Sequence, residues 1–72
     1  MSDLRFSSSQ EDVINALRTG GPSTALALTE LTGRNRVSVY KALRSLSSSG
    51  FITAVGVEKH NGRDAIIWEV SL

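Results

Sequence analysis

The stretch from residue 30 to residue 50 constrains the fold more than any other part of the chain, because it predicts two helices separated by a very short break. Gly33 can adopt the left-handed conformation in which many helices end, and Asn35 is a residue type that caps the start of the next helix. Apolar residues then recur at helical spacing, namely Val39, Leu43 and Leu46. The sequence therefore predicts a helix over residues 36–48 with one buried stripe.

The opposite face of this helix carries cations and no acid. Its members are Val37, Tyr40, Lys41, Arg44 and Ser48. The net charge of the 72-residue chain is only +1, but residues 31–57 hold four basic residues and no acidic one. A local basic surface of this kind is compatible with nucleic-acid binding, although it is weaker evidence than a strongly basic domain.

Two more helices are predicted before this one. Ser9 and the acidic residues after it resemble a capping box, and the apolar residues Val13, Ile14 and Leu17 follow at helical spacing. The segment Gly20-Gly21-Pro22 ends this first helix near residue 19. Ser23 or Thr24 can cap a short second helix, whose apolar residues are Leu26, Leu28 and Leu31. We expect residues 1–7 to form an N-terminal arm, with Leu4 and Phe6 against the body.

The end of the chain predicts a β-hairpin. Residues 51–57 and 65–70 are rich in β-forming side chains, and Asn61-Gly62 lies between them. This dipeptide favours a tight hairpin turn, since both turn residues must accept positive φ. Counting outward from the turn gives three opposed pairs, which are His60 with Arg63, Val57 with Ile66, and Val55 with Trp68.

The predicted fold class is therefore α+β: a winged helix-turn-helix in which three helices are followed by a C-terminal β-hairpin wing, over residues 8–72. A plain three-helix bundle is the alternative. It is disfavoured by the 22 residues of β-like sequence that follow Gly50.

The run from Glu30 to Gly33, with Arg36 and the segment from Val39 to Leu43 after it, resembles winged-helix regulators of the ArsR-like and MarR-like families. The resemblance covers roughly residues 10–70. It implies a dimeric transcription regulator that places its third helix in the major groove of DNA and its wing against the backbone or the minor groove. Arg34 departs from the pattern, because the residue after the turn glycine is usually apolar.

Z-alpha domains, which bind Z-form nucleic acid, offer a second and weaker similarity. Trp68 lies where these domains carry a wing tryptophan. Their helix asparagine and tyrosine, however, would fall on Tyr40 and Arg44, and their wing prolines on Ala65 and Ile66. Three of the four signature features are therefore absent.

The predicted DNA-binding residues lie on the third helix, the turn before it and the wing. Side chains in the first two turns of such a helix reach base edges, Val37 can contact a thymine methyl, and the helix start favours a phosphate. Arginine and its basic neighbours at the wing tip suit phosphates or the minor groove. The predicted set is Arg34, Asn35, Arg36, Val37, Ser38, Tyr40, Lys41, Arg44, Lys59, His60 and Arg63.

No catalytic arrangement is predicted, because the single histidine lies in a loop and no glycine-rich phosphate loop is present. The absence of cysteine rules out thiolate metal sites and the metal-sensing branch of the regulators, so no metal or cofactor is expected. The amino terminus lacks a signal peptide and no segment is apolar enough to span a membrane, which predicts a cytoplasmic protein.

The predicted partner is double-stranded DNA. We also expect a homodimer formed through helix 1 and the N-terminal arm, since one recognition helix is seldom sufficient for specific binding. The small size favours a mobile-element protein with no effector domain. The alternative function is a protein–protein interaction module, with a polymerase, replication or host-defence partner; it predicts a docking surface around Tyr40, Val37 and the wing.

Overall fold

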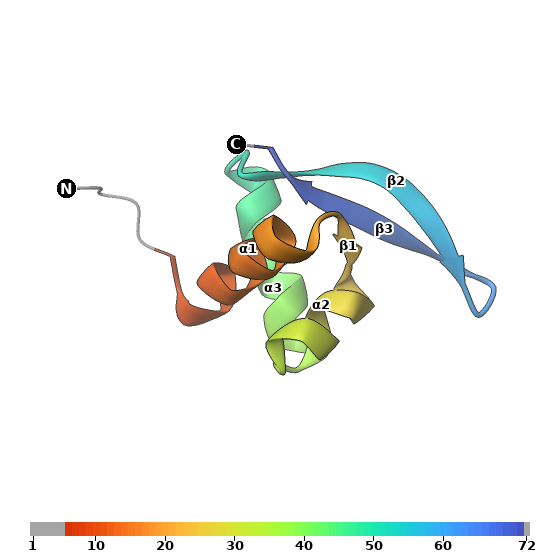
Figure 1. Ribbon diagram of the computed structural model, residues 1–72, viewed down its shortest axis with the longest axis horizontal. Coiled ribbons are helices and arrows are strands. Elements are labelled where there is room, and N and C mark those ends of the chain that lie inside the picture. The colour runs from red at the N-terminus through yellow and green to blue at the C-terminus, as the bar shows by residue number, and fades with distance from the viewer. Residues whose placement is uncertain (1–5, 72) are drawn as a thin grey trace.

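A computed structural model describes residues 6–71 and has the predicted architecture of three helices and a small antiparallel sheet (Figure 1). The helices are α1 (Ser8–Gly20), α2 (Ala25–Thr32) and α3 (Arg36–Ser48). The strands are β1 (Ser23–Thr24), β2 (Ile52–His60) and β3 (Arg63–Val70), in the spatial order β1-β3-β2. Strands β2 and β3 form a hairpin that extends beyond the helices as a wing, so the predicted fold class is confirmed.

The cap of α1 differs from the prediction. Ser7, not Ser9, is the N-cap, and its Oγ accepts a hydrogen bond from the Gln10 amide at 3.2 Å while Gln10 Oε1 accepts one from the Ser7 amide at 2.8 Å. The reciprocal pair satisfies two amides that the helix itself cannot. Just before the cap, the ring of Phe6 meets that of Phe51 edge-on, with centroids 5.1 Å apart. The predicted contact of Leu4 lies outside the described residues.

The break between α2 and α3 is built as the sequence predicts. Gly33 has a φ of 72°, in the left-handed region, and its amide donates to the Thr29 carbonyl oxygen. Asn35 caps α3, because its Oδ1 accepts from the Ser38 amide at 2.8 Å. Thr24 is the N-cap of α2. Three local caps therefore fix where these helices begin and end.

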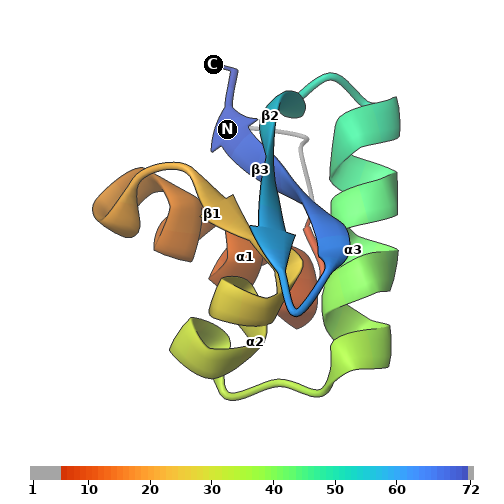
Figure 2. The ribbon, with the colours of Figure 1, turned by 90° about the vertical axis from the view of Figure 1, so that its right-hand side faces the viewer.

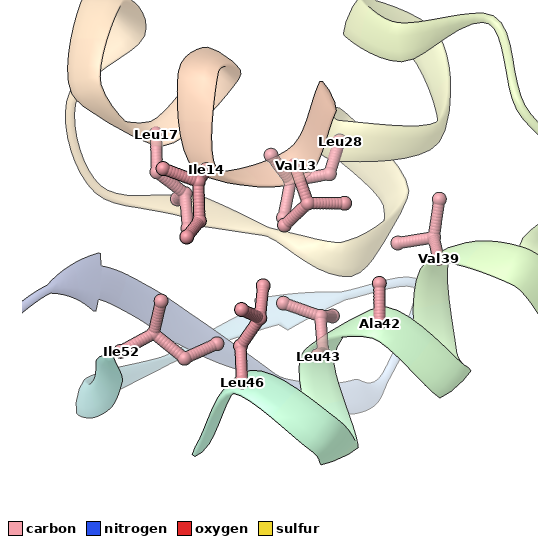
Figure 3. Close-up of a cluster of buried hydrophobic side chains, with 9 residues drawn as sticks. All are labelled: Val13, Ile14, Leu17, Leu28, Val39, Ala42, Leu43, Leu46 and Ile52. Atoms are coloured by element: carbon pink, nitrogen blue, oxygen red, sulfur yellow. The ribbon is translucent and has the colours of Figure 1, made fainter. Parts of the chain in front are cut away.

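The core lies where α1, α2, α3 and the base of the sheet meet (Figure 3). It consists of Val13, Ile14, Leu17, Leu28, Val39, Ala42, Leu43, Leu46 and Ile52. Among the three leucines of α2, Leu28 alone is in this core, whereas Leu26 is 41% exposed and Leu31 is 61% exposed. The helix is short and lies at the edge of the body, so only one of its faces is covered.

The hairpin turns at Asn61 and Gly62, which both have positive φ. The predicted pairs of His60 with Arg63 and Val57 with Ile66 are confirmed. The predicted pairing of Val55 with Trp68 is wrong, because an irregularity between Ala54 and Gly56 inserts one extra residue and places Ala54 opposite Trp68.

The two-residue strand β1 was not predicted. Ser23 pairs with Trp68 and Thr24 with Ile67, so β1 joins the base of the wing. Because α2 begins at the residue after β1, the sheet is attached directly to α2.

Candidate nucleic-acid interface

Helix α3, the wing and the start of α2 line an open groove of about 780 Å³. Figure 2, viewed from the tip of the wing, shows α3 on the right of the hairpin. Basic side chains from two elements line the groove. Arg36, Lys41 and Arg44 come from α3, and His60 and Arg63 from the wing. These residues are far apart in the sequence, and the fold brings them onto one concave surface.

Apolar side chains line the same groove. Val37 and Tyr40 of α3 are 64% and 55% exposed, and the exposed Leu26 and Ile66 come from α2 and β3. Trp68, which is only partly buried, also contributes to the lining. The surface therefore combines cations with exposed apolar and aromatic side chains. The cations suit the phosphates of a nucleic acid, and the apolar side chains suit its sugars or bases.

The orientation of α3 follows from its sequence. Val39, Ala42, Leu43 and Leu46 are buried. This confirms the predicted apolar face and leaves the cationic face in solvent. The helix contains no acidic residue. An anion that approaches it consequently meets attraction along the whole exposed face.

On the wing, the basic residues are not equivalent. His60 and Arg63 line the groove, whereas Lys59 Nζ lies 3.9 Å from Asp64 Oδ1 and is not part of the lining. Both members of this ion pair are highly exposed, so the pair contributes little to stability. Asp64 is the one acidic residue that lines the groove in the described part of the chain.

Arg34 lies apart from the other predicted residues. Its Nε donates to Asp12 Oδ2 of α1 at 2.7 Å, which ties the turn before α3 to α1. It does not line the groove. Asn35 and Ser38 are joined to one another by the cap of α3, so the Ser38 amide is already occupied.

A second, smaller hollow of about 300 Å³ lies between the start of α1 and α3, and the predicted residues Ser38 and Lys41 lie there beside residues of α1 that were not predicted to be part of a site. Gln10 Nε2 donates to Ser45 Oγ at 2.7 Å across this junction. Ser7 and Ser9 line the hollow together with Ser38 and Lys41. The Ser7–Gln10 spacing was the available signal for the cap, but nothing local indicates that Gln10 also contacts α3.

Within residues 6–71, no group of three or more His, Cys, Asp or Glu side chains is arranged to hold a metal ion. None of the described helices combines the length and the apolar character needed to cross a bilayer.

The fold resembles that of several solved winged-helix proteins. The zinc-responsive MarR family member ZitR of Lactococcus lactis is 21% identical, with a TM-score of 0.78 over 97% of this chain and 46% of that one. ZitR has also been solved in complex with DNA, and that structure is 24% identical with a TM-score of 0.74. The chain thus spans about half the length of ZitR.

Two shorter proteins match over most of their own length. Stf76 from the Sulfolobus islandicus plasmid-virus pSSVx is 21% identical, with a TM-score of 0.75 over 92% of this chain and 84% of that one. The Zalpha domain of Carassius auratus PKZ, solved in complex with Z-DNA, is 21% identical, with a TM-score of 0.67 over 86% of this chain and 90% of that one. Both similarities predicted from the sequence, to MarR-like regulators and to Z-alpha domains, are confirmed at the level of the fold.

No curated protein sequence matches the chain. The model of one family does match, over residues 1–63, and the family is described as the sugar-specific transcriptional regulator TrmB. This match confirms the predicted class of protein, a winged-helix transcriptional regulator. The chain belongs to the TrmB family of transcriptional regulators.

Proposed function

We propose that this domain regulates transcription by binding a specific sequence of duplex DNA, with α3 in the major groove and the wing on the adjacent backbone or minor groove. The observation that carries the proposal is the convergence of Arg36, Lys41 and Arg44 with the wing residues His60 and Arg63 around one groove. A predominantly basic cleft of this kind attracts a polyanion, and phosphate neutralisation supplies much of the affinity for DNA.

The exposed face of α3 suits the reading of bases. Arg36, Val37, Tyr40 and Lys41 all lie in the first two turns of the helix, which are the turns that reach base edges in related folds. Arginine and lysine favour guanine, and Val37 offers a methyl-sized apolar contact for thymine. Arg44 lies one turn later, where it contacts either a guanine or a phosphate.

The remaining predicted contacts have smaller roles. Lys59 and Arg34 each have an acidic neighbour, so their net attraction for a phosphate is reduced. Asn35 and Ser38 belong to the helix cap, and in the proposed complex they set the position of α3 and bring the helix start close to a phosphate.

The proposed complex contains two copies of the chain. The expected dimer surface on α1 is poorly supported, since the large exposed apolar residues of the described chain lie on α2, α3 and the wing and none lies on α1. Phe6 is also partly buried against the chain's own body. The homodimer, the cytoplasmic location and the mobile-element origin belong to the same proposal.

A protein-docking module is the second candidate function. The observation that favours it is the exposure of Val37, Tyr40 and Ile66 in the same groove as the cations. Such a partner would cover these apolar side chains, and its binding would depend weakly on salt.

The experiment that tests DNA binding is fluorescence anisotropy with a labelled mixed-sequence duplex over a series of salt concentrations. We expect affinity to fall steeply with salt, and each lost phosphate contact to make the slope of log K against log salt shallower by about 0.9. Arg44→Ala should show this change, and Lys41→Ala/Arg44→Ala about twice as much.

Arg18→Ala is the matched control, because it removes an exposed cation of α1 that does not line the groove. It should leave the slope close to that of the wild type. Equal slopes for Arg18→Ala and Arg44→Ala would contradict the proposed role of α3. No binding by the wild type at low salt would favour the protein-docking function.

A further inference from the structure

We infer that the groove between α3 and the wing is also a binding site for a single strand of nucleic acid, in which a base stacks on Tyr40. This inference goes beyond duplex recognition and does not depend on it. It rests on what lines the groove and on which ligands are able to cover that lining.

The charges that line the groove indicate that its ligand is a polyanion. Five basic residues line the groove, and Asp64 is the one acid among the described lining residues. Asp64 in turn lies beside Lys59, which partly offsets its charge. An acidic phosphodiester chain is complementary to this surface, whereas a basic peptide is repelled by it.

The apolar residues of the groove favour a single strand over a duplex. Leu26, Tyr40 and Ile66 are large, exposed and lie in the same groove. When α3 lies in the major groove of a duplex, its side chains meet only the edges of bases that remain stacked on one another. A duplex therefore offers no base face on which Tyr40 can stack.

A single strand does not have this restriction, because its bases are free to turn toward the protein. Proteins that bind single strands combine a positively charged groove with aromatic side chains on which bases stack. Tyr40 is 55% exposed and lines the groove, so its ring is available for stacking. Arg36 and Lys41 of the same helix line the groove with Tyr40, and in the inferred complex they hold the flanking phosphates.

The chain supplies its own reporter for this site. Trp68 is the single tryptophan and lies in the groove lining, half-buried at the base of the wing. A strand that enters the groove changes the surroundings of its indole ring and hence its fluorescence. A strand bound elsewhere on the surface leaves the emission unchanged.

The test uses the whole chain and a labelled oligothymidylate of about 12 nucleotides, a length within the range of known single-strand sites. Binding is followed by anisotropy of the label and by Trp68 emission, and the same strand annealed to its complement serves as the duplex arm. Oligouridylate in parallel distinguishes RNA from DNA as the source of the strand. We expect the unpaired strand to bind and to change the emission of Trp68.

The variants identify the contact. Tyr40→Ala should weaken strand binding by about 5- to 150-fold, the range given by the loss of one base–aromatic stack, whereas Tyr40→Phe keeps the ring and should retain binding. Leu31→Ala is the control, since Leu31 is an exposed apolar residue outside the groove. Folding of each variant is checked by circular dichroism.

Three results overturn the inference. If the duplex binds and the unpaired strand does not, the inference fails while the proposed function stands. If neither binds, both fail. If the strand binds but Tyr40→Ala behaves like Leu31→Ala, or Trp68 emission does not change, the strand is held by charge alone and the groove is not its site.

Discussion

Leu28 offers the sharpest test of how this small domain is stabilised. Its side chain is fully buried between the helices, whereas Leu31 of the same helix is 61% exposed. Leu28→Ala and Leu31→Ala are therefore the same chemical change at two positions of one helix, with opposite burial. Any effect of the substitution on helix propensity is shared by both variants, and the difference between them isolates burial.

The expected difference follows from the cost of an internal cavity. Removing a buried leucine side chain destabilises proteins by about 2.7–5.0 kcal/mol, and an exposed substitution changes stability by roughly 0.5 kcal/mol or less. A domain of 72 residues has a total stability of about 4–11 kcal/mol. We therefore expect Leu28→Ala to remove a large fraction of the free energy of unfolding, and Leu31→Ala to remove almost none.

The assay is urea-induced unfolding of each variant, followed by circular dichroism and by the fluorescence of Trp68. The two signals should give coincident transitions, and the denaturant dependence should stay unchanged between variants. A difference between Leu28→Ala and Leu31→Ala of less than about 1 kcal/mol would refute the reasoning, because the transfer term alone exceeds that value for a fully buried leucine.

Three further predictions concern local features. Gly33→Ala should lower the free energy of unfolding by about 1–2 kcal/mol, because φ is 72° at this position. Gly20→Ala is the control, since Gly20 is helical and has no positive φ, and it should leave the free energy of unfolding unchanged. Thermal unfolding of the two variants makes the comparison. Gln10→Ala should lower the free energy of unfolding in urea by about 0.5–1.5 kcal/mol, because the Ser7 amide and Ser45 Oγ each lose a hydrogen-bond partner, and no change would contradict these contacts. Asp12→Asn should lower the free energy of unfolding by at most about 1 kcal/mol, because the ion pair is partly exposed. It should also tighten binding to duplex DNA at low salt, because Arg34 loses its acidic neighbour. Unchanged affinity in anisotropy titrations would show that Arg34 does not contact DNA.

The parts of the fold that follow from local chemistry were predictable. Gly33, Asn35 and the Asn61-Gly62 turn each satisfy a backbone requirement within a few residues, so the sequence specifies them without reference to the rest of the chain. The cap of α1 was misplaced because two nearby serines fit similar patterns. The decisive difference is that Gln10 lies three residues after Ser7 and can return its hydrogen bond.

Features that depend on pairing between distant segments were not predictable in the same way. The extra residue at Val55 shifts the register of the three pairs at the base of the wing, and counting from the turn cannot detect it. The strand β1 is two residues long and exists because β3 lies beside it. Neither signal is present in a local window of sequence.

The candidate site likewise has a part that local sequence predicts and a part that depends on tertiary structure. Helical periodicity predicted the exposed face of α3, including Val37, Tyr40 and Lys41. It did not predict that Leu26 and Ile66 would lie opposite this face, nor that Arg34 would be drawn toward Asp12. The groove is a property of three elements together, so only the tertiary structure reveals it.

The short strand β1 also has a consequence for the order in which the parts of the domain fold. The contacts among α1, α2 and α3 join neighbouring segments, and such local contacts form early. The pairing of Ser23 with Trp68, by contrast, closes a loop that contains most of the domain. The helices can therefore associate before the wing is in place, whereas the sheet is completed only when β3 pairs with β1. A chain that has folded only its helices therefore lacks the wing half of the proposed recognition surface.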